Sequence, residues 1–192
     1  PTNEKMNNEY FPVLSNDKKE EMLELLEKVR LDNDSVGGIL ETYVEGIEGG
    51  IGEPFFDSIE SMISSLVFSV PAIKGVSFGK GFGFAELLGS SANDPFTYEN
   101  NKVITKTNNN GGINGGISNG MPIIVNTVIK ATPSIYQTQE TVNLETKENT
   151  TLNIEGRHDP CIIHRARVVV ESMIAIALVD LHVSRYGYLW MK

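Results

Sequence analysis

The residues best suited to chemistry in this sequence form the hexapeptide GRHDPC at positions 156–161. Arg157 supplies a guanidinium that can bind a phosphate, and an Arg near an Asp can also position a polar heterocycle. Asp159 precedes Pro160, a pair that commonly begins a helix, so an N-cap is an equally weighted alternative for this carboxylate. In that case Arg157 and His158 would lie near the positive end of the helix, where free backbone N–H groups favour an anion.

A glycine-rich loop, GGINGGISNG at positions 111–120, is the second candidate. Its glycines let the backbone adopt positive φ angles and approach a ligand closely. The alternative is a flexible linker, although linkers seldom place isoleucines at regular intervals between their glycines. A dinucleotide-binding fingerprint requires a βαβ unit, and the sequence around the loop does not predict one, so phosphate binding by the backbone stays open.

The segment KATPS at positions 130–134 ends an expected strand with a cation, two hydroxyls and a rigid proline. Such a turn can hold an anionic group, because Lys130 supplies charge while the hydroxyls and backbone N–H groups donate hydrogen bonds. An ordinary turn at the end of a strand would have a similar sequence. The two interpretations of this segment therefore have equal weight.

Other chemistries have little support in the sequence. Cys161 could be a thiol activated at a helix N-terminus, but a structural role has far more weight. The sequence contains neither HExxH nor a comparable spacing of metal ligands, and it lacks a GxSxG motif. We therefore expect no metal centre and no hydrolase triad, and we interpret His158 and His164 as structural residues.

Hydrophobic periodicity and turn-forming residues predict the elements that must position these segments. Helices are expected at about 17–30, after 54, and from 159–160 to about 182. Strands are expected at 38–47, 73–78, 82–88, 123–130 and 141–154, the last being broken by a turn near 147–149. The strands at 73–78 and 82–88 should form a hairpin. This mixed order predicts an α+β fold with antiparallel sheets and a single domain over residues 1–192.

Composition and charge exclude several classes of protein. The 192 residues carry a formal net charge of −9 without a long basic run, so neither a nucleic acid nor an anionic membrane is an expected partner. One cysteine cannot form an internal disulfide, which favours a reducing compartment. The longest apolar stretch, 161–183, is interrupted by charged residues, and the first residues lack a targeting pattern. We therefore expect a cytoplasmic protein.

Five segments occur in an order that resembles the C-terminal half of chorismate synthases. They are GEPFFDSIES, PAIKGVSFGKGF, GGINGGISNGMPI, KATPSI and GRHDPCIIHRA, and together they extend over about residues 52–180. A GRHDPC motif at this separation after a GGI-rich loop is very unlikely to arise by chance. The resemblance implies a fold in which helices are sandwiched between antiparallel β layers, and a homotetramer.

The resemblance also implies a reaction, the trans-1,4 elimination of phosphate from 5-enolpyruvylshikimate 3-phosphate to give chorismate. Reduced FMN is required although no net oxidation occurs. Losing phosphate from an allylic carbon builds electron deficiency, which an electron-rich reduced flavin can relieve. The resemblance leaves open whether the enzyme reduces its own flavin with NADPH or relies on an external reductase.

The family's functional residues can be transferred to matching positions in this chain, where the flavin-contacting segments are 71–72, 115, 130–134 and 156–161. Asp159 matches an aspartate proposed to assist proton transfer at flavin N5, and Arg157 would lie within reach of the substrate phosphate. Pro71 and Ala131 differ from residues common in the family, but contacts made by backbone atoms should survive both changes. The implied flavin contacts are Pro71, Ala72, Gly115, Lys130, Ala131, Thr132, Pro133, Ser134 and Arg157.

Full members of the family are nearly twice as long, and their N-terminal half carries two catalytic histidines and substrate-binding arginines. We therefore expect this chain to be inactive alone, and none of His158, His164 or His182 should replace the missing groups. The charge of −9 agrees, because two anionic ligands need a basic partner half. Two alternatives stay open, an assembly domain that binds no flavin and a flavin-binding module for another reaction. The run Asn108–Asn110 is expected to become ordered only when FMN binds.

Overall fold

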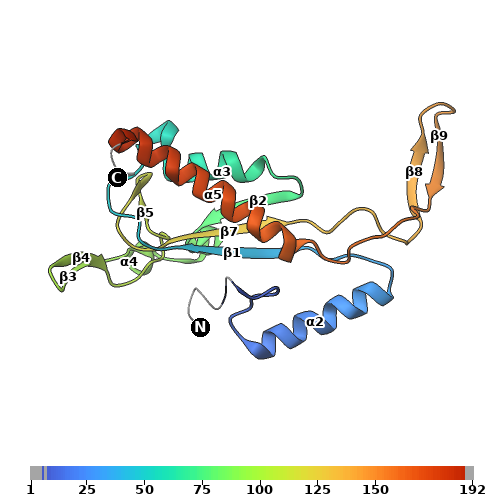
Figure 1. The fold of residues 1–192 in the computed structure, drawn as a ribbon, viewed down its shortest axis with the longest axis horizontal. Helices are drawn as coiled ribbons and strands as arrows, with labels where there is room; N and C mark the ends of the chain where they lie inside the picture. Colours follow the sequence, from blue (N-terminus) through green and yellow to red (C-terminus); the bar gives the residue numbers. More distant parts are fainter. Residues whose placement is uncertain (1–5, 7, 189–192) are drawn as a thin grey trace. The chain divides into compact units, whose positions relative to one another are not determined.

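The computed structural model describes residue 6 and residues 8–188, and it shows an α+β protein with antiparallel strand pairs (Figure 1). The predicted fold class is therefore confirmed. Contacts divide the chain into two compact units. Unit 1 covers positions 1–38 and 130–166, and unit 2 covers positions 39–129 and 167–192. The single domain expected over residues 1–192 stays a prediction.

Unit 2 is built on a three-stranded sheet with the strand order β1 (Gly38–Val44), β7 (Ile123–Ile129), β2 (Ile73–Phe78). Strands β2 and β7 are antiparallel, and Val76 lies opposite Thr127. Alternate residues of the central strand β7 are buried, as expected where one face of a sheet is covered. The strands expected at 38–47, 73–78 and 123–130 are thus confirmed.

Helices α3 (Ile59–Phe68) and α5 (Ile163–Tyr186) cover one face of this sheet (Figure 1). Helix α3 begins after Ser58, whose hydroxyl accepts a hydrogen bond from the Ser61 N–H at 3.1 Å. Both helices bury residues at helical spacing. These are Ile59, Ile63 and Val67 on α3, and Val170, Ile174, Ala177, Leu178 and Leu181 on α5. No helix in the described part of the chain is long and apolar enough to cross a membrane.

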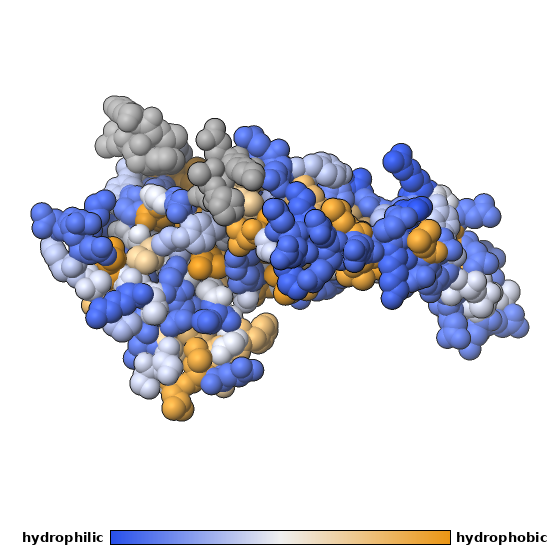
Figure 2. Space-filling view, turned by 90° about the horizontal axis from the view of Figure 1, so that it is seen from below, coloured by the Kyte–Doolittle hydropathy of each residue, from blue (hydrophilic) through white to orange (hydrophobic). Residues whose placement is uncertain are grey.

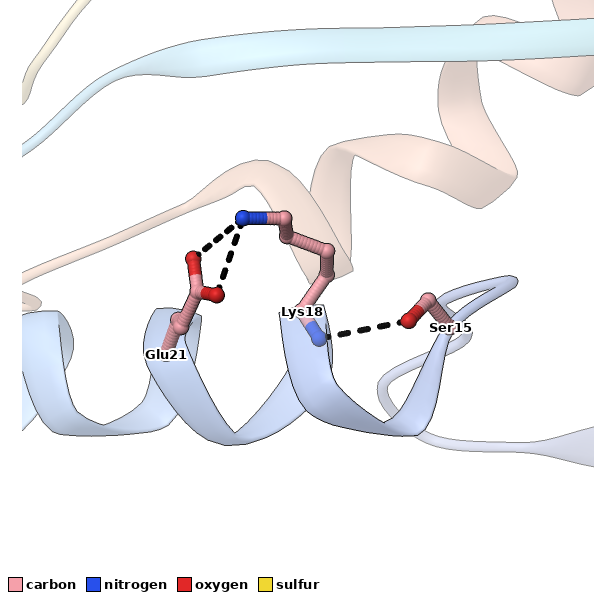
Figure 3. A network of polar contacts seen from close by, with 3 residues as sticks. All are labelled: Ser15, Lys18 and Glu21. Carbon is pink, nitrogen blue, oxygen red and sulfur yellow. Dashed lines mark hydrogen bonds and ion pairs between the residues drawn. The ribbon is translucent and has the colours of Figure 1, made fainter.

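Unit 1 contains helix α2 (Asn16–Leu31), which confirms the helix predicted at 17–30. The Ser15 hydroxyl accepts a hydrogen bond from the Lys18 N–H, and the Lys18 ammonium pairs with Glu21 at 2.6 Å (Figure 3). This cap and this ion pair lie in the first two turns of the helix. Helix α2 has no buried residue, so capping and charge pairing support it where a core does not.

Three small hairpins complete the sheets. In unit 1, β8 (Gln139–Asn143) pairs with β9 (Glu148–Leu152), which confirms the broken strand expected at 141–154. Nearly every residue of this hairpin is exposed, and an isolated hairpin is only marginally stable in water. The hairpins of unit 2 are β3 (Phe96–Glu99) with β4 (Lys102–Thr105) and β5 (Ile113–Asn114) with β6 (Ile117–Ser118). Unit 2 also contains the short helical segments η1 (Phe55–Asp57), η2 (Gly81–Glu86) and α4 (Gly89–Ala92).

The strand expected at 82–88, and the hairpin it was to form with 73–78, are wrong. Residues of this stretch form the 3-10 helix η2, and β2 pairs with β7 instead. Gly79 and Gly81 have φ angles of +54° and +53°, which take the chain out of the extended conformation. A side chain at Gly81 would lie 2.6 Å from the Ser77 hydroxyl oxygen, so close packing also requires glycine here.

The last helix, α5, begins later than the start expected at 159–160. The Pro160 carbonyl accepts a hydrogen bond from the Val36 N–H at 2.9 Å, which holds this residue outside the helix. The first helical hydrogen bonds go to the carbonyl of Ile162 instead. The N-cap alternative for Asp159 is therefore wrong, and its carboxylate is available for other contacts.

Candidate functional site

In unit 1 the GRHDPC segment lines a cavity of about 600 Å³. Arg157, His158, Asp159 and Pro160 contribute to its wall, together with two residues from the start of α5. The remaining wall comes from α2 and the segment before it. These further lining residues are Tyr10, Phe11, Leu23, Leu26, His164 and Arg165. The cavity thus combines apolar and aromatic groups with two guanidiniums and one carboxylate.

The Asp159 carboxylate is held from two directions. Its Oδ2 forms an ion pair with the Arg165 guanidinium, and its Oδ1 accepts a hydrogen bond from the Cys161 N–H at 3.3 Å. The Arg165 side chain is 61% exposed, so the pair adds little to folding stability. Its effect is to orient the carboxylate and to satisfy it. The Arg157 guanidinium forms no ion pair or hydrogen bond with the residues that the structure describes, and it remains exposed.

The backbone next to Arg157 is fixed by an aromatic pair. The Tyr136 and His158 rings pack edge to face, with their centroids 4.4 Å apart. The Tyr136 hydroxyl donates a hydrogen bond to the Gly156 carbonyl. His158 Nε2 lies 3.1 Å from the Ile154 carbonyl oxygen. The structural role expected for His158 is consistent with these contacts.

His164 is part of an aromatic cluster. Its ring lies 4.9 Å from Tyr10 and 6.4 Å from Phe11. These rings form the apolar side of the cavity in unit 1. The position of His164 among aromatic rings agrees with the structural role that the sequence suggested.

The KATPS segment is anchored through its carbonyl groups. The Ser35 hydroxyl donates to the Thr132 carbonyl at 2.6 Å, and the Gln139 amide donates to the Pro133 carbonyl at 3.1 Å. The Thr132 hydroxyl is buried and makes no hydrogen bond within the described chain. A buried hydroxyl without a partner is costly, so this oxygen lacks a hydrogen bond that its surroundings would be expected to supply. Lys130 is exposed at the start of the segment.

In unit 2 the implied contacts Pro71 and Ala72 form the turn between α3 and β2. Ala72 has a φ angle of +72°, in the left-handed region that residues other than glycine seldom adopt. Such a conformation costs about 1–3 kcal/mol, and it clusters at ligand sites and other functional segments. The strain at Ala72 is an observation that the sequence did not reveal.

The glycines of the 111–120 loop have two different roles. A side chain at Gly111, Gly112 or Gly116 would lie within 2.5–2.6 Å of a neighbouring atom, so these positions need glycine for packing. Gly115 differs, because it is exposed and a side chain there would have no neighbour within 4 Å. Gly115 and Gly116 have φ angles of +60° and +86° and form the turn of the β5–β6 hairpin. The linker interpretation is therefore wrong, and Gly115 is the glycine with open space for a ligand.

A buried carboxylate that the sequence analysis missed fixes the start of this loop. Asp94 is only 8% exposed and accepts hydrogen bonds of 2.7–2.8 Å from Thr107, Asn109 and Asn110. Successive backbone N–H groups at Asn109 and Asn110 thus already hold an anion, so they are not free to cradle a phosphate. Asn108 also bonds the Pro122 carbonyl at 2.8 Å. The residues Asn108–Asn110 thus have defined hydrogen-bond partners within the chain, and their ordering on FMN binding stays a prediction.

Burial disfavours ionisation of Asp94, but hydrogen bonds from Asn110, Thr107 and Asn109 outweigh it and lower the pKa of this carboxyl. The signal in the sequence would have been the pairing of an ANDP segment with a later run of asparagines. These residues are 13–16 positions apart, so local patterns do not connect them.

Together, these features describe an α+β protein whose unit 1 contains a cavity suited to an anionic ligand. A model of the chorismate synthase family matches residues 2–183. The chain belongs to the chorismate synthase family.

The relatives agree with this assignment. The chorismate synthase of Thermococcus gammatolerans is 47% identical over 173 residues, which are 90% of this chain and 48% of that protein. The Thermococcus kodakarensis chorismate synthase is 49% identical over 161 residues, covering 84% of this chain and 45% of that protein. A crystal structure of chorismate synthase superimposes with a TM-score of 0.72 and 29% identity, covering 89% of this chain and 44% of that one. The chain therefore spans about half the length of the relatives it matches.

The two classes of glycine can be separated by substitution. We predict that Gly116→Ala lowers the free energy of unfolding by about 2–4 kcal/mol, because the methyl group would meet the Ser58 side chain and keep a strained φ. Gly115→Ala has the strain without the clash and should cost about 1 kcal/mol. Urea unfolding followed by circular dichroism measures both values. Equal losses in the two variants would contradict the distinction.

The lowered pKa of Asp94 makes stability depend on pH. Because the folded-state pKa lies below the ordinary value, the contribution is complete above that value and is lost as pH falls through the folded pKa. Asp94→Asn should lower the free energy of unfolding at neutral pH by about 2 kcal/mol or more. It should also make the acid limb, the fall of the unfolding free energy at acid pH, less steep. Unfolding free energies measured from neutral to acid pH test this. Glu148→Gln, in the exposed strand β9, is the control and should leave the acid limb unchanged.

Proposed function

We propose that this chain is the half of a chorismate synthase that contacts reduced FMN and the phosphate of 5-enolpyruvylshikimate 3-phosphate. The observation that carries the proposal is the Arg157 guanidinium, which lines a cavity with Asp159 and forms no ion pair with any described residue. The complete enzyme would eliminate phosphate and a ring proton to give chorismate. The family match over residues 2–183 supports this reaction.

Arg157 has the properties that a departing phosphate requires. Cleavage of the carbon–oxygen bond leaves additional negative charge on the phosphate, which a positioned cation stabilises. A guanidinium stays charged at neutral pH and offers parallel N–H donors to such a group. The carboxylate of Asp159, two positions after Arg157, is paired with Arg165. That ion pair leaves Arg157 free for a ligand.

Asp159 is the proposed group for proton transfer at flavin N5. The chemistry that bound reduced FMN would supply is electron density toward the electron-deficient substrate carbon. The two contacts of Asp159, to Arg165 and to the Cys161 N–H, limit the rotation of its carboxylate. A carboxylate with a fixed orientation can hold or accept a proton at a defined atom.

The remaining proposed flavin contacts are divided between the two units, and those of each unit have features that suit contact with a ligand. In unit 1, the Thr132 hydroxyl is buried without a partner among the described residues, and Lys130 is exposed. In unit 2, Gly115 leaves open space and Ala72 has a strained backbone. The other proposed contacts, Pro71, Ala131, Pro133 and Ser134, can offer backbone groups whatever their side chains are.

The proposed enzyme needs a second half, and the helix layer of unit 2 supports this. Helix α5 exposes Val168, Val169, Ile176 and Val179, with exposed fractions between 43% and 58%. Figure 2, which views the protein from below and so shows a different face, also has hydrophobic residues exposed among hydrophilic ones. Extended apolar surface on a helix whose opposite side is buried marks a surface that another part covers. We propose that the N-terminal half covers it, within a cytoplasmic homotetramer.

The test is chorismate formation from 5-enolpyruvylshikimate 3-phosphate and chemically reduced FMN without oxygen, followed by absorbance. We expect no turnover by this chain alone, and turnover when it is co-expressed with the N-terminal half of the Thermococcus gammatolerans enzyme. In the combined protein, Arg157→Ala should lower kcat/KM at least about 100-fold, the scale for losing one charge-stabilising group. Arg30→Ala is the control, because this exposed guanidinium pairs with Glu27 on α2.

Three outcomes would count against the proposal. Turnover by this chain alone would contradict the need for a second half. Full activity of Arg157→Ala would remove its assigned role. A combined protein that assembles but neither binds FMN nor forms chorismate would favour the assembly domain.

A further inference from the structure

The glycine-rich loop and the asparagine before it contain three Asn–Gly pairs, at 110–111, 114–115 and 119–120. In such a pair the backbone nitrogen of glycine can attack the side-chain amide carbon of the preceding asparagine, because glycine has no side chain to hinder the approach. The three pairs are alike in sequence. The structure gives them very different surroundings.

Asn110 is held on every side. Its backbone N–H and its side-chain amide each donate to Asp94 at 2.8 Å. Its neighbour Gly111 is buried, and the Gly111 N–H donates to the Asn108 carbonyl at 3.2 Å. Attack by Gly111 on Asn110 would require these hydrogen bonds to break.

Asn119 is also held, at both ends of its side-chain amide. Its Nδ2 donates to Asn114 Oδ1 at 2.6 Å, and its Oδ1 accepts from the Met121 N–H at 2.9 Å. The nitrogen that would leave on attack by Gly120 is therefore the one that serves as a donor. This pair is less restrained than Asn110, because the hydrogen bonds involve no buried carboxylate.

Asn114 is the least restrained of the three. It is exposed, and its Nδ2 makes no hydrogen bond with the described residues. Gly115 is exposed too, its N–H has no partner in the described chain, and its Cβ position faces open space. The hydrogen bond from Asn119 to Asn114 Oδ1 draws electron density from the carbonyl, which makes its carbon more open to attack.

We infer that Asn114 is the preferred site of spontaneous deamidation in this chain. The Gly115 nitrogen gives its proton to a base and bonds to the Asn114 side-chain carbonyl carbon. The bond from that carbon to Nδ2 breaks, and the nitrogen leaves as ammonia after taking a proton from water. Water then opens the resulting five-membered imide at either carbonyl. The products are aspartate and isoaspartate, and the net change is one water consumed and one ammonia released.

Deamidation would place a carboxylate beside Gly115, and the isoaspartate product would add a backbone carbon to the β5–β6 turn. In a chain of net charge −9, this change disfavours an anionic ligand at the turn. The functional consequence rests on the proposed flavin contact at Gly115. The chemical preference for Asn114 does not, because it follows from hydrogen bonds and exposure alone.

The test incubates the folded chain at mildly alkaline pH and measures conversion at each asparagine by peptide mass spectrometry. Asn114 should react at least about tenfold faster than Asn110, the factor for breaking one hydrogen bond to a charged group. Asn119 should fall between them. In the chain unfolded with urea, the three sites should react at comparable rates, because the restraints are gone.

A folded chain in which Asn110 or Asn119 reacts as fast as Asn114 would overturn the inference. So would the same ranking in urea, because the preference would then come from local sequence. As a further check, Gly115→Ala should slow conversion at Asn114 and leave Asn119 unchanged. None of these readouts uses FMN, so a failure to bind FMN would count against the proposed function and leave this inference intact.

Discussion

The backbone of residues 107–118 packs directly against other backbone and side-chain atoms of unit 2, without room for side chains at several positions. This close packing is the constraint on which the rest of unit 2 depends. Glycines at 111, 112 and 116 leave no room for a side chain, and the buried Asp94 carboxylate accepts hydrogen bonds from the start of the loop. The Gly116 carbonyl in turn accepts from the Ile59 N–H at 3.0 Å, at the first turn of α3. Packing, burial and charge thus hold the hairpin whose exposed tip is Gly115.

Unit 1 is organised by charge more than by burial. Helix α2 buries no residue and the β8–β9 hairpin is exposed, yet the GRHDPC segment has defined partners. The two arginines near Asp159 have different roles. Arg165 forms an ion pair with the Asp159 carboxylate, whereas Arg157 has no partner among the described residues. Such exposed pairs contribute little to stability, so their value lies in positioning.

Much of the fold could be predicted from the sequence because local patterns determine it. Amphipathic spacing indicated α2 and α3, and strand-like hydrophobic patterns bounded by turn-forming residues indicated β2 and β7. The strand predicted at 82–88 was wrong because the prediction used only the local hydrophobic pattern. The positive φ angles of Gly79 and Gly81 depend instead on packing against the loop at 109–111 and against Ser77. The start of α5 was misplaced because a hydrogen bond from Val36 holds Pro160. Asp94 was missed because its partners are distant in the sequence. The site residues came from resemblance to a family, and their roles stay proposals.

The central claim is that flavin contacts lie in this half of the enzyme, and backbone amide NMR of the isotopically labelled chain, combined with an unlabelled N-terminal half, tests it most directly. On addition of FMN, the account predicts shifts of the amide signals of Gly115, Thr132 and Arg157, with little change in the exposed hairpin β8–β9. Binding of FMN that leaves these three signals in place would contradict the account, because the flavin would then be held by the other half alone.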